Sequence, residues 1–532
     1  MVLAYFTPEV VLPVASVLAN VFGGASDVWR HIAVTLLPRY VGNTLLLTAG
    51  VAAGVVSMGV LSAWLVAMYR FPGRALLQWV LVLPLAMPAY VMAYAYTDWL
   101  QTSGPVQTAL RGLTGWQVRD YWFPDVRSLW GGAAMLSFAL YPYVYIIART
   151  AFTELSRSAL EAARLAGYSQ RDVFLRVAIP LARPAIVAGT LLALMETLAD
   201  FGTVSYFGLE VFTTGIFKAW FSMGDRVAAA QLSSCLLLFV GVLIALERAS
   251  RGRAAYHVDS PRKAAPPLTL RGWPAAVALA LCAAPVFFGF LLPLALLGWL
   301  AWQSGAFNAA RLPALIANSF GIAAVTALVA VVLATLMAYA GRLTGSRAVG
   351  AANRVVSLGY AVPGAVIAVG VLAPLGVLDN ALAAWLERSF GVRTGLLLTG
   401  TIAALVFAYL VRLLAVALQT TEAGLARITP SMADAARSLG ASPGQTLRRV
   451  HVPLLRPSLA TAALLVFVDV LKELPATFAL RPFNFDTLAI EAYNLAKDER
   501  LAEAAGPSLV IVAVGMLPVI FVARRYFQAT RS

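Results

Sequence analysis

The sequence predicts an all-α membrane protein of about twelve transmembrane helices, arranged as two parallel halves of six. The first observation is composition: 60% of the 532 residues are hydrophobic, 12% are charged and mean hydropathy is +0.79. Soluble chains are nearer half apolar and a quarter charged. The second is a set of uncharged runs, such as 43–69 and 315–340, each long enough to cross a hydrocarbon layer of about 30 Å. The third is an internal repeat, described below.

Twelve apolar segments are the expected spans. They lie near residues 2–22, 43–69, 75–98, 129–150, 184–206 and 228–247, and then near 273–302, 315–341, 354–378, 394–416, 457–478 and 505–523. The first segment is interrupted by Pro8, Glu9 and Pro13, which leaves open whether it is a complete span.

The formal net charge of +15 is concentrated in alternate loops. Arginines cluster in 151–183, 248–272 and 417–456, whereas the loop 479–504 is rich in acids. Because cytoplasmic loops of membrane proteins collect Lys and Arg, the three basic segments and both chain termini are expected in the cytoplasm. No nucleic acid is expected as a partner, since no basic stretch alternates with aromatic residues in a soluble module.

A polar, basic and proline-bearing stretch separates two hydrophobic parts of similar length. We therefore expect a first half at 1–248, a cytoplasmic linker at 249–272 and a second half at 273–532. Each half would contain about six spans and one cationic loop, at 151–183 and 417–456 respectively.

The two halves repeat in sequence. Residues 160–184 and 433–457 are identical at eleven of 25 positions, with a constant offset of 273 residues. Asn43 and Asn318 open corresponding spans at an offset of 275. Because both copies have the same order of spans, the repeat is parallel, as in a fused dimer.

The repeated loop predicts a helix–turn–helix on the cytoplasmic side. The run EAARLA, residues 161–166, favours a helix with small residues on one side. Gly167 can supply the left-handed residue that ends this helix. A second short helix, at about 170–177, is expected to stop before Pro180. One such loop would equally suit a helix resting on the membrane surface, but two copies at the same spacing favour a partner with two equivalent grooves.

This pattern resembles the signature of binding-protein-dependent ABC importer permeases, in which EAA is followed by Gly five residues after the first Ala and by Pro thirteen residues further on. The second copy has Asp in place of Glu, which keeps the charge. The resemblance implies that both loops dock to an ATPase subunit, expected as a dimer. The matching residues are Glu161, Ala162, Ala163, Gly167 and Pro180, and then Asp434, Ala435, Ala436, Gly440 and Pro453.

The chain contains no G-x-x-x-x-G-K-[ST] motif. ATP is therefore expected on the separate ATPase subunit. This chain itself is expected to be no enzyme and to bind no cofactor of its own.

Two further stretches, 196–221 and 469–489, resemble the fused permeases of ferric-iron importers. The resemblance implies a multi-pass protein of the bacterial inner membrane that receives ferric iron from a periplasmic binding protein. The fused thiamine permeases are similar as well, so thiamine or another small cation stays open as an alternative cargo. Whether iron arrives bare or chelated also stays open.

Two acidic pairs lie in these stretches. Glu196 and Asp200 are four residues apart and so share one helix face, and Asp469 and Glu473 repeat the pair at the offset of 273. Charged groups at membrane depth usually face a pathway or a partner, and a trivalent hard cation prefers oxygen ligands. We predict that the four carboxylates line the substrate pathway, with transient iron contacts but no stable metal site. The alternative places Asp200 and Glu473 in a wet periplasmic loop, with Lys472 neutralising a neighbour.

Tyr90, Tyr94, Tyr141 and Tyr145 also fall at i, i+4 spacing. Phenolic oxygen can ligate iron, but an interfacial aromatic belt is the favoured interpretation. An ion-coupled secondary transporter is the rival class, since two parallel six-helix halves occur there too. A membrane enzyme is disfavoured, because the sequence has no nucleophile–base or metal-binding constellation.

Overall fold

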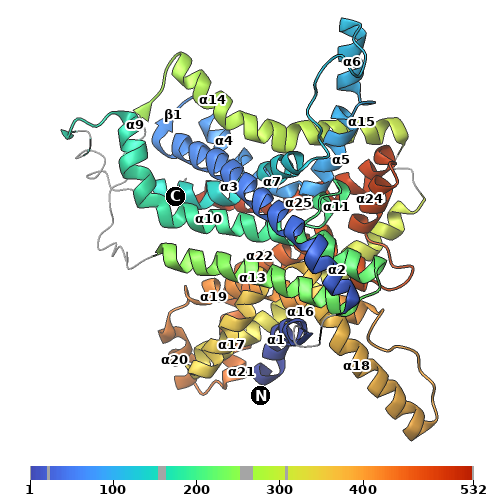
Figure 1. Ribbon diagram of the computed structural model, residues 1–532. Helices are drawn as coiled ribbons and strands as arrows, with labels where there is room; N and C mark the ends of the chain where they lie inside the picture. Colours follow the sequence, from blue (N-terminus) through green and yellow to red (C-terminus); the bar gives the residue numbers. More distant parts are fainter. Residues whose placement is uncertain are drawn as a thin grey trace. The chain divides into compact units, whose positions relative to one another are not determined.

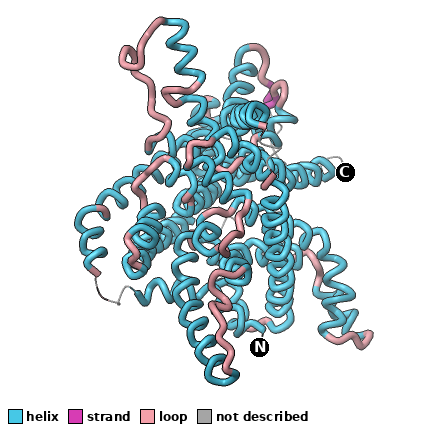
Figure 2. Tube along the Cα trace, turned by 90° about the vertical axis from the view of Figure 1, so that its right-hand side faces the viewer, coloured by secondary structure: helices cyan, strands magenta, loops and turns pink. Residues whose placement is uncertain are grey.

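The computed structural model is almost entirely helical (Figures 1 and 2) and describes residues 2–529 except 21–23, 25, 154–162, 164, 252–267 and 306–309. Within this part the only sheet pairs β1 (Tyr69–Arg70) in parallel with β2 (Leu268–Thr269). The predicted all-α class is confirmed. Of the predicted features, Glu161, Ala162 and most of the 249–272 linker lie outside the described residues.

The chain divides into two compact units that do not follow the sequence halves. One unit, here the 37–214 unit, consists of residues 37–214, 238–306 and 495–532, and the other, the 307–494 unit, consists of 1–36, 215–237 and 307–494. Each unit therefore combines the middle of one sequence half with end segments of the other. The predicted halves 1–248 and 273–532 describe the sequence repeat, whereas the compact units divide the chain differently.

In the 37–214 unit, three long helices pack against one another, α3, α7 and α10, and α14, α15 and α25 complete the unit (Figure 1). Small residues allow the close approach: a Cβ on Gly59 of α3 would lie 2.7 Å from the Val144 side chain of α7. The elements are α3 (Leu37–Met68), β1, α4 (Arg74–Val80), η2 (Leu83–Ala86), α5 (Ala89–Leu100), α6 (Pro105–Thr114), α7 (Leu129–Thr153), α9 (Gln170–Asp172), η3 (Val173–Ala178), α10 (Ile179–Ala199), α11 (Gly202–Tyr206), β2, α14 (Trp273–Val286), η5 (Phe287–Leu291), α15 (Leu292–Ser304) and α25 (Leu501–Ala529).

The 307–494 unit repeats this arrangement, because α16, α19 and α22 pack against one another as α3, α7 and α10 do. The N-terminal α1 joins this unit against α18, where Gly370 lies too close to the backbone of Pro13 for any side chain. The elements are α1 (Val2–Ala19), α2 (Asp27–Thr35), η4 (Lys218–Ser222), α16 (Leu312–Thr344), α17 (Arg347–Leu358), η7 (Gly359–Ala361), α18 (Gly364–Phe390), α19 (Ile402–Leu425), α20 (Pro430–Ser438), α21 (Pro443–Thr446), η8 (Leu447–His451), α22 (Val452–Lys472) and α23 (Pro475–Leu480). Three helices cross the unit limits, namely α12 (Phe212–Phe217), α13 (Arg226–Arg251) and α24 (Leu488–Lys497).

Ten of the described helices are long and apolar enough to cross a membrane, and one bent pair would make eleven. The prediction was about twelve. The difference lies at α1, the segment that prolines interrupt, which forms a helix but is not among the ten. The multi-pass character of the chain is therefore confirmed.

Two predicted spans are wrong in detail. The span expected at 75–98 breaks after Ala86 with a bend of 90°, where Pro84 and Pro88 remove backbone donors. The span expected at 394–416 begins only at Ile402, because the residues before it form a loop.

Candidate coupling and pathway sites

Both repeated loops contain the left-handed glycine that the sequence predicts. The φ angles are +82° at Gly167 and +81° at Gly440. In each loop the amide after the glycine donates to a carbonyl five residues back, that of Ala163 at 3.1 Å and that of Ala436 at 3.0 Å. This is the hydrogen bond of a Schellman helix end. The turn geometry is thus confirmed, whereas the role of these glycines in coupling stays a prediction.

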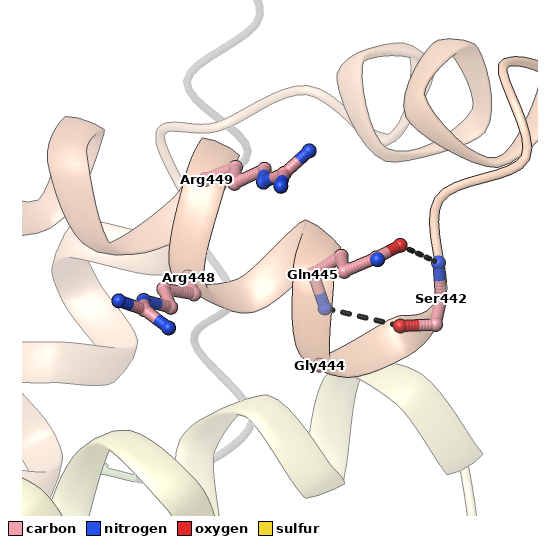
Figure 3. A pocket seen from close by; sticks show the side chains of 5 residues that line it. All are labelled: Ser442, Gly444, Gln445, Arg448 and Arg449. Carbon is pink, nitrogen blue, oxygen red and sulfur yellow. Dashed lines mark hydrogen bonds between the residues drawn. The ribbon is translucent and has the colours of Figure 1, made fainter.

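The second helix of each loop begins with a serine cap that the sequence interpretation missed. The Ser169 hydroxyl accepts from the Asp172 amide at 3.2 Å, and the Ser442 hydroxyl accepts from the Gln445 amide at 3.3 Å. Figure 3 shows that Gln445 also accepts from the Ser442 amide, at 2.9 Å, which completes a capping box. The two serines, identical at the repeat offset and each just after a glycine turn, were the available signal.

Pro180 and Pro453 do not stop the second helix, so this part of the prediction is wrong. Continuous helices run over 170–199 and 443–472. A π-helical turn, η3 or η8, precedes each proline, and the amide just before the proline donates to a carbonyl five residues back. This wider turn accommodates the proline, whose ring clashes with the carbonyl four residues back in a regular α-helix. Each loop is therefore joined to its span by one uninterrupted helix.

The loops expose apolar side chains next to their arginines. The most exposed are Leu165 at 89%, Leu439 at 88%, Met432 at 46% and Tyr168 at 41%. Ala435 is exposed and Ala436 half-buried, but Ala163 is only 7% exposed and so faces its own chain instead of a partner. Asp434 forms an ion pair with Arg437 at 2.5 Å. Exposed apolar groups of this kind, surrounded by charge, are typical of surfaces that contact another protein.

A cavity of about 570 Å³ lies beside the second helix of the 443–472 segment. It is lined by Ser442, Gly444, Gln445, Arg448 and Arg449 (Figure 3). The two arginines extend in different directions from the backbone (Figure 3). The lining offers cationic donors, which suit acidic groups of a partner.

Asp200 and Glu473 follow directly on α10 and α22 and cap the next short helices, α11 and α23. Asp200 accepts from the amides three and four residues ahead, both at 3.1 Å. Glu473 accepts from the corresponding amides at 3.0 Å and from the Thr477 hydroxyl at 2.7 Å. Glu473 is 7% exposed, so the alternative of a wet loop is wrong for this residue. Both carboxylates have a structural role that sequence spacing did not reveal.

The other two acids differ from each other. Glu196 lies half-buried on α10, whereas Asp469 on α22 forms an ion pair with Lys472 at 2.8 Å. Each acidic pair belongs to its own unit, so the convergence of all four carboxylates stays a prediction. Within either unit, the described residues form no cluster of three His, Cys, Asp or Glu side chains that could hold a metal ion.

The four tyrosines do not form an interfacial belt, so that interpretation is wrong. Tyr90, Tyr94, Tyr141 and Tyr145 are at most 5% exposed. Tyr145 donates to the Gln78 carbonyl at 2.9 Å, which ties α7 to α4. Helical spacing placed these residues on common faces, but only packing shows that those faces are internal.

Two other polar positions organise the loops after the spans. Asn43 donates to the Glu210 carbonyl at 2.9 Å, and Asn318 donates to the Asp486 carbonyl at 3.1 Å, so the repeated asparagines make equivalent bonds. Sequence reasoning missed Asp379, which is fully buried in α18. Its carboxylate accepts from the amides of residues 397, 398 and 399 at 2.7 to 2.8 Å, and from the Thr399 hydroxyl.

An all-helical membrane chain that carries two equivalent docking loops, each continuous with a span, has the architecture of a transporter's membrane-spanning component. The comparison with known families agrees: the chain belongs to the family of binding-protein-dependent transport system inner membrane components, which matches residues 56–252 and 330–529. The predicted pair of permease domains in one chain is therefore confirmed.

Individual relatives cover the chain to different extents. The Fe(3+)-transport system permease protein FbpB 2 of Haemophilus influenzae is 26% identical over 512 residues, which is 94% of this chain and 93% of the relative. The probable ABC transporter permease protein y4fN of Sinorhizobium fredii is 27% identical over 509 residues, 91% of this chain and 86% of the relative. The molybdenum transport system permease protein ModB of Escherichia coli is 31% identical over 207 residues, 37% of this chain and 87% of the relative.

Family membership settles the class of function. The chain is a permease subunit of an ABC importer, and such subunits are not themselves enzymes. The rival classes, an ion-coupled secondary transporter and a membrane enzyme, are excluded. The cargo is not decided by the family, because ModB is named for molybdenum and FbpB 2 for iron.

Proposed function

We propose that this chain moves ferric iron across the bacterial inner membrane, with its termini in the cytoplasm. The observation that carries the proposal is the likeness to FbpB 2, which extends over 94% of the chain and includes both permease domains. The likeness to ModB covers only 37% of the chain and thus one domain at a time.

The proposed partners follow from the two ends of the transport path. A dimer of ATPase subunits binds the two repeated loops and holds the ATP, and this chain binds no cofactor. The exposed leucines and arginines of the loops support this contact. A periplasmic binding protein delivers the cargo to the opposite face.

The proposed pathway contacts are Glu196 and Asp469, with Asp200 and Glu473 holding the adjoining short helices in place. Carboxylate oxygens suit a hard trivalent cation. Acidic walls attract cations and repel anions, so they are a poor lining for an oxyanion such as molybdate. Thiamine, an organic cation, remains the alternative cargo, because charge does not distinguish it from iron.

The test combines a double substitution with three labelled cargoes. Glu196→Gln with Asp469→Asn removes two charges with little change in shape. We expect the variant to lose most uptake of labelled iron in cells that contain the matching binding protein, while membrane insertion and ATPase binding persist. Glu387→Gln with Asp27→Asn, two exposed acids outside the proposed pathway, is the matched control.

Labelled thiamine and molybdate are measured in parallel with the wild-type chain. Uptake of either compound without uptake of iron would overturn the proposed cargo. Undiminished iron uptake by the double variant would instead leave the cargo in place and remove these carboxylates from the path.

A further inference from the structure

The last turns of α16 contact both ends of the second repeated loop. The Arg342 guanidinium donates to the carbonyls of Leu425 and Ile428, both at 2.7 Å, just before α20 begins. The Tyr339 hydroxyl donates to the Pro443 carbonyl at 2.8 Å, where α21 begins. Tyr339 and Arg342 are three residues apart and therefore lie on one face of α16. That face thus binds the entrance and the exit of the loop together.

The first half has a corresponding contact with different chemistry. Trp64 of α3 lies 275 residues before Tyr339 and is 5% exposed. Its ring centroid is 5.3 Å from that of Phe152 at the end of α7 and 5.0 Å from that of Phe174 in η3. These two phenylalanines flank the first loop, at its entrance and its exit. One helix in each half therefore contacts both ends of its loop, by ring packing in one case and by hydrogen bonds in the other.

We propose that α3 and α16 carry the displacement of the loops into the membrane, with Trp64, Tyr339 and Arg342 as positioning residues. The inference rests on the proposed ATP-driven function. A displaced loop can also act through α10 and α22, which continue from it without a break. The contacts on α3 and α16 add a second route.

The two routes differ in stiffness because of their chemistry. Hydrogen bonds to backbone carbonyls are directional and weaken steeply with misalignment, so α16 has to follow its loop. Packed rings at 5 to 6 Å separation tolerate small shifts in their offset, so α3 can slide relative to the first loop. The second loop is therefore expected to move its helix more strongly than the first.

The test follows each helix separately in the full chain bound to its ATPase subunit. Cys235 and Cys282 are first replaced, and a spin label is attached at position 328 on α16 or at position 454 on α22. The native residues there, Leu328 and Leu454, are 67% and 50% exposed. In the wild-type background, ATP with vanadate is expected to change the spectrum at both positions.

In the Tyr339→Phe, Arg342→Gln variant we expect the shifted population at position 328 to fall about tenfold, as the loss of several hydrogen bonds implies, while position 454 still responds. Thr335→Val is the matched control, because that hydroxyl bonds only to the Val331 carbonyl within α16. Tyr339→Phe alone retains the ring, 5.3 Å from that of His451, and is used if the double variant does not accumulate.

The outcomes separate the two levels of the argument. A persistent response at position 328 in the variants, with normal ATPase binding, overturns the role of α16. A response at position 454 but none at position 328 in the wild type does the same. No response at either wild-type position overturns the ATP-driven function and this inference with it.

Discussion

Substitution of the two turn glycines tests whether the loop geometry is needed for coupling. Gly167 and Gly440 have φ near +80°, and an added Cβ at either would meet no atom within 4 Å. Steric clashes with neighbours are therefore absent, and the cost comes from the backbone alone. For an L-residue the left-handed conformation costs about 1–2 kcal/mol, and a β-branched residue lies at the upper end. Each Val substitution should shift the local equilibrium away from the native turn by roughly 5- to 30-fold.

The assay compares Val, Ala and Asn at each glycine. We expect the affinity for the ATPase subunit and ATP-dependent uptake to fall in the order Asn, Ala, Val, since Asn tolerates the left-handed region best. The double Val variant should lose about 3–4 kcal/mol, because the two loops share no hydrogen-bond partner and the costs add. Insertion into the membrane should stay unchanged. Normal uptake by the double variant at normal expression would refute the reasoning.

Three further predictions concern topology and the loops between spans. Cysteines introduced at Arg253 and Asp498 should label from opposite sides of the membrane, and labelling of both from outside would contradict the proposed orientation. Asp379→Asn should destabilise the 391–401 loop by about 1–3 kcal/mol, because an amide nitrogen cannot accept from the donors around it; faster proteolysis of this loop than in an Asp379→Glu control would show it. A hydrogen bond from Arg127 lowers the pKa of Glu499, so this contact stabilises the loop above the ordinary Glu pKa of about 4.3 and is lost as pH falls through the lowered value; Arg127→Gln should remove that pH dependence in hydrogen-exchange measurements.

Much of the architecture could be predicted because it depends on local chemistry. Long uncharged runs have to form helices in a membrane, since hydrocarbon leaves backbone groups no other partners. The left-handed turns at Gly167 and Gly440 follow from the freedom of a residue without a Cβ, which neighbouring residues do not alter. The constant offset of the repeat, visible in the letters alone, identified equivalent loops before any coordinates were known.

The candidate pathway could be predicted only in part. Spacing placed Asp200 and Glu473 correctly at the end of a span, but not their bonds to the amides that follow. A carboxylate that ends a helix can point into a channel or turn back to cap the next helix, and its sequence neighbours are similar in both cases. Asp379 was missed for the same reason, because its partners lie about 20 residues away.

The sequence by itself determined the class of fold, the number of halves and the turn glycines, because these depend on composition and on the conformational limits of single residues. Only the tertiary structure decided that Pro180 and Pro453 lie inside continuous helices, since a π-helical turn can accommodate a proline that a regular turn rejects. Only the tertiary structure decided that α1 packs in the 307–494 unit. That contact depends on the fit of Gly370 against Pro13, and residues so distant in sequence meet only when the whole chain has folded.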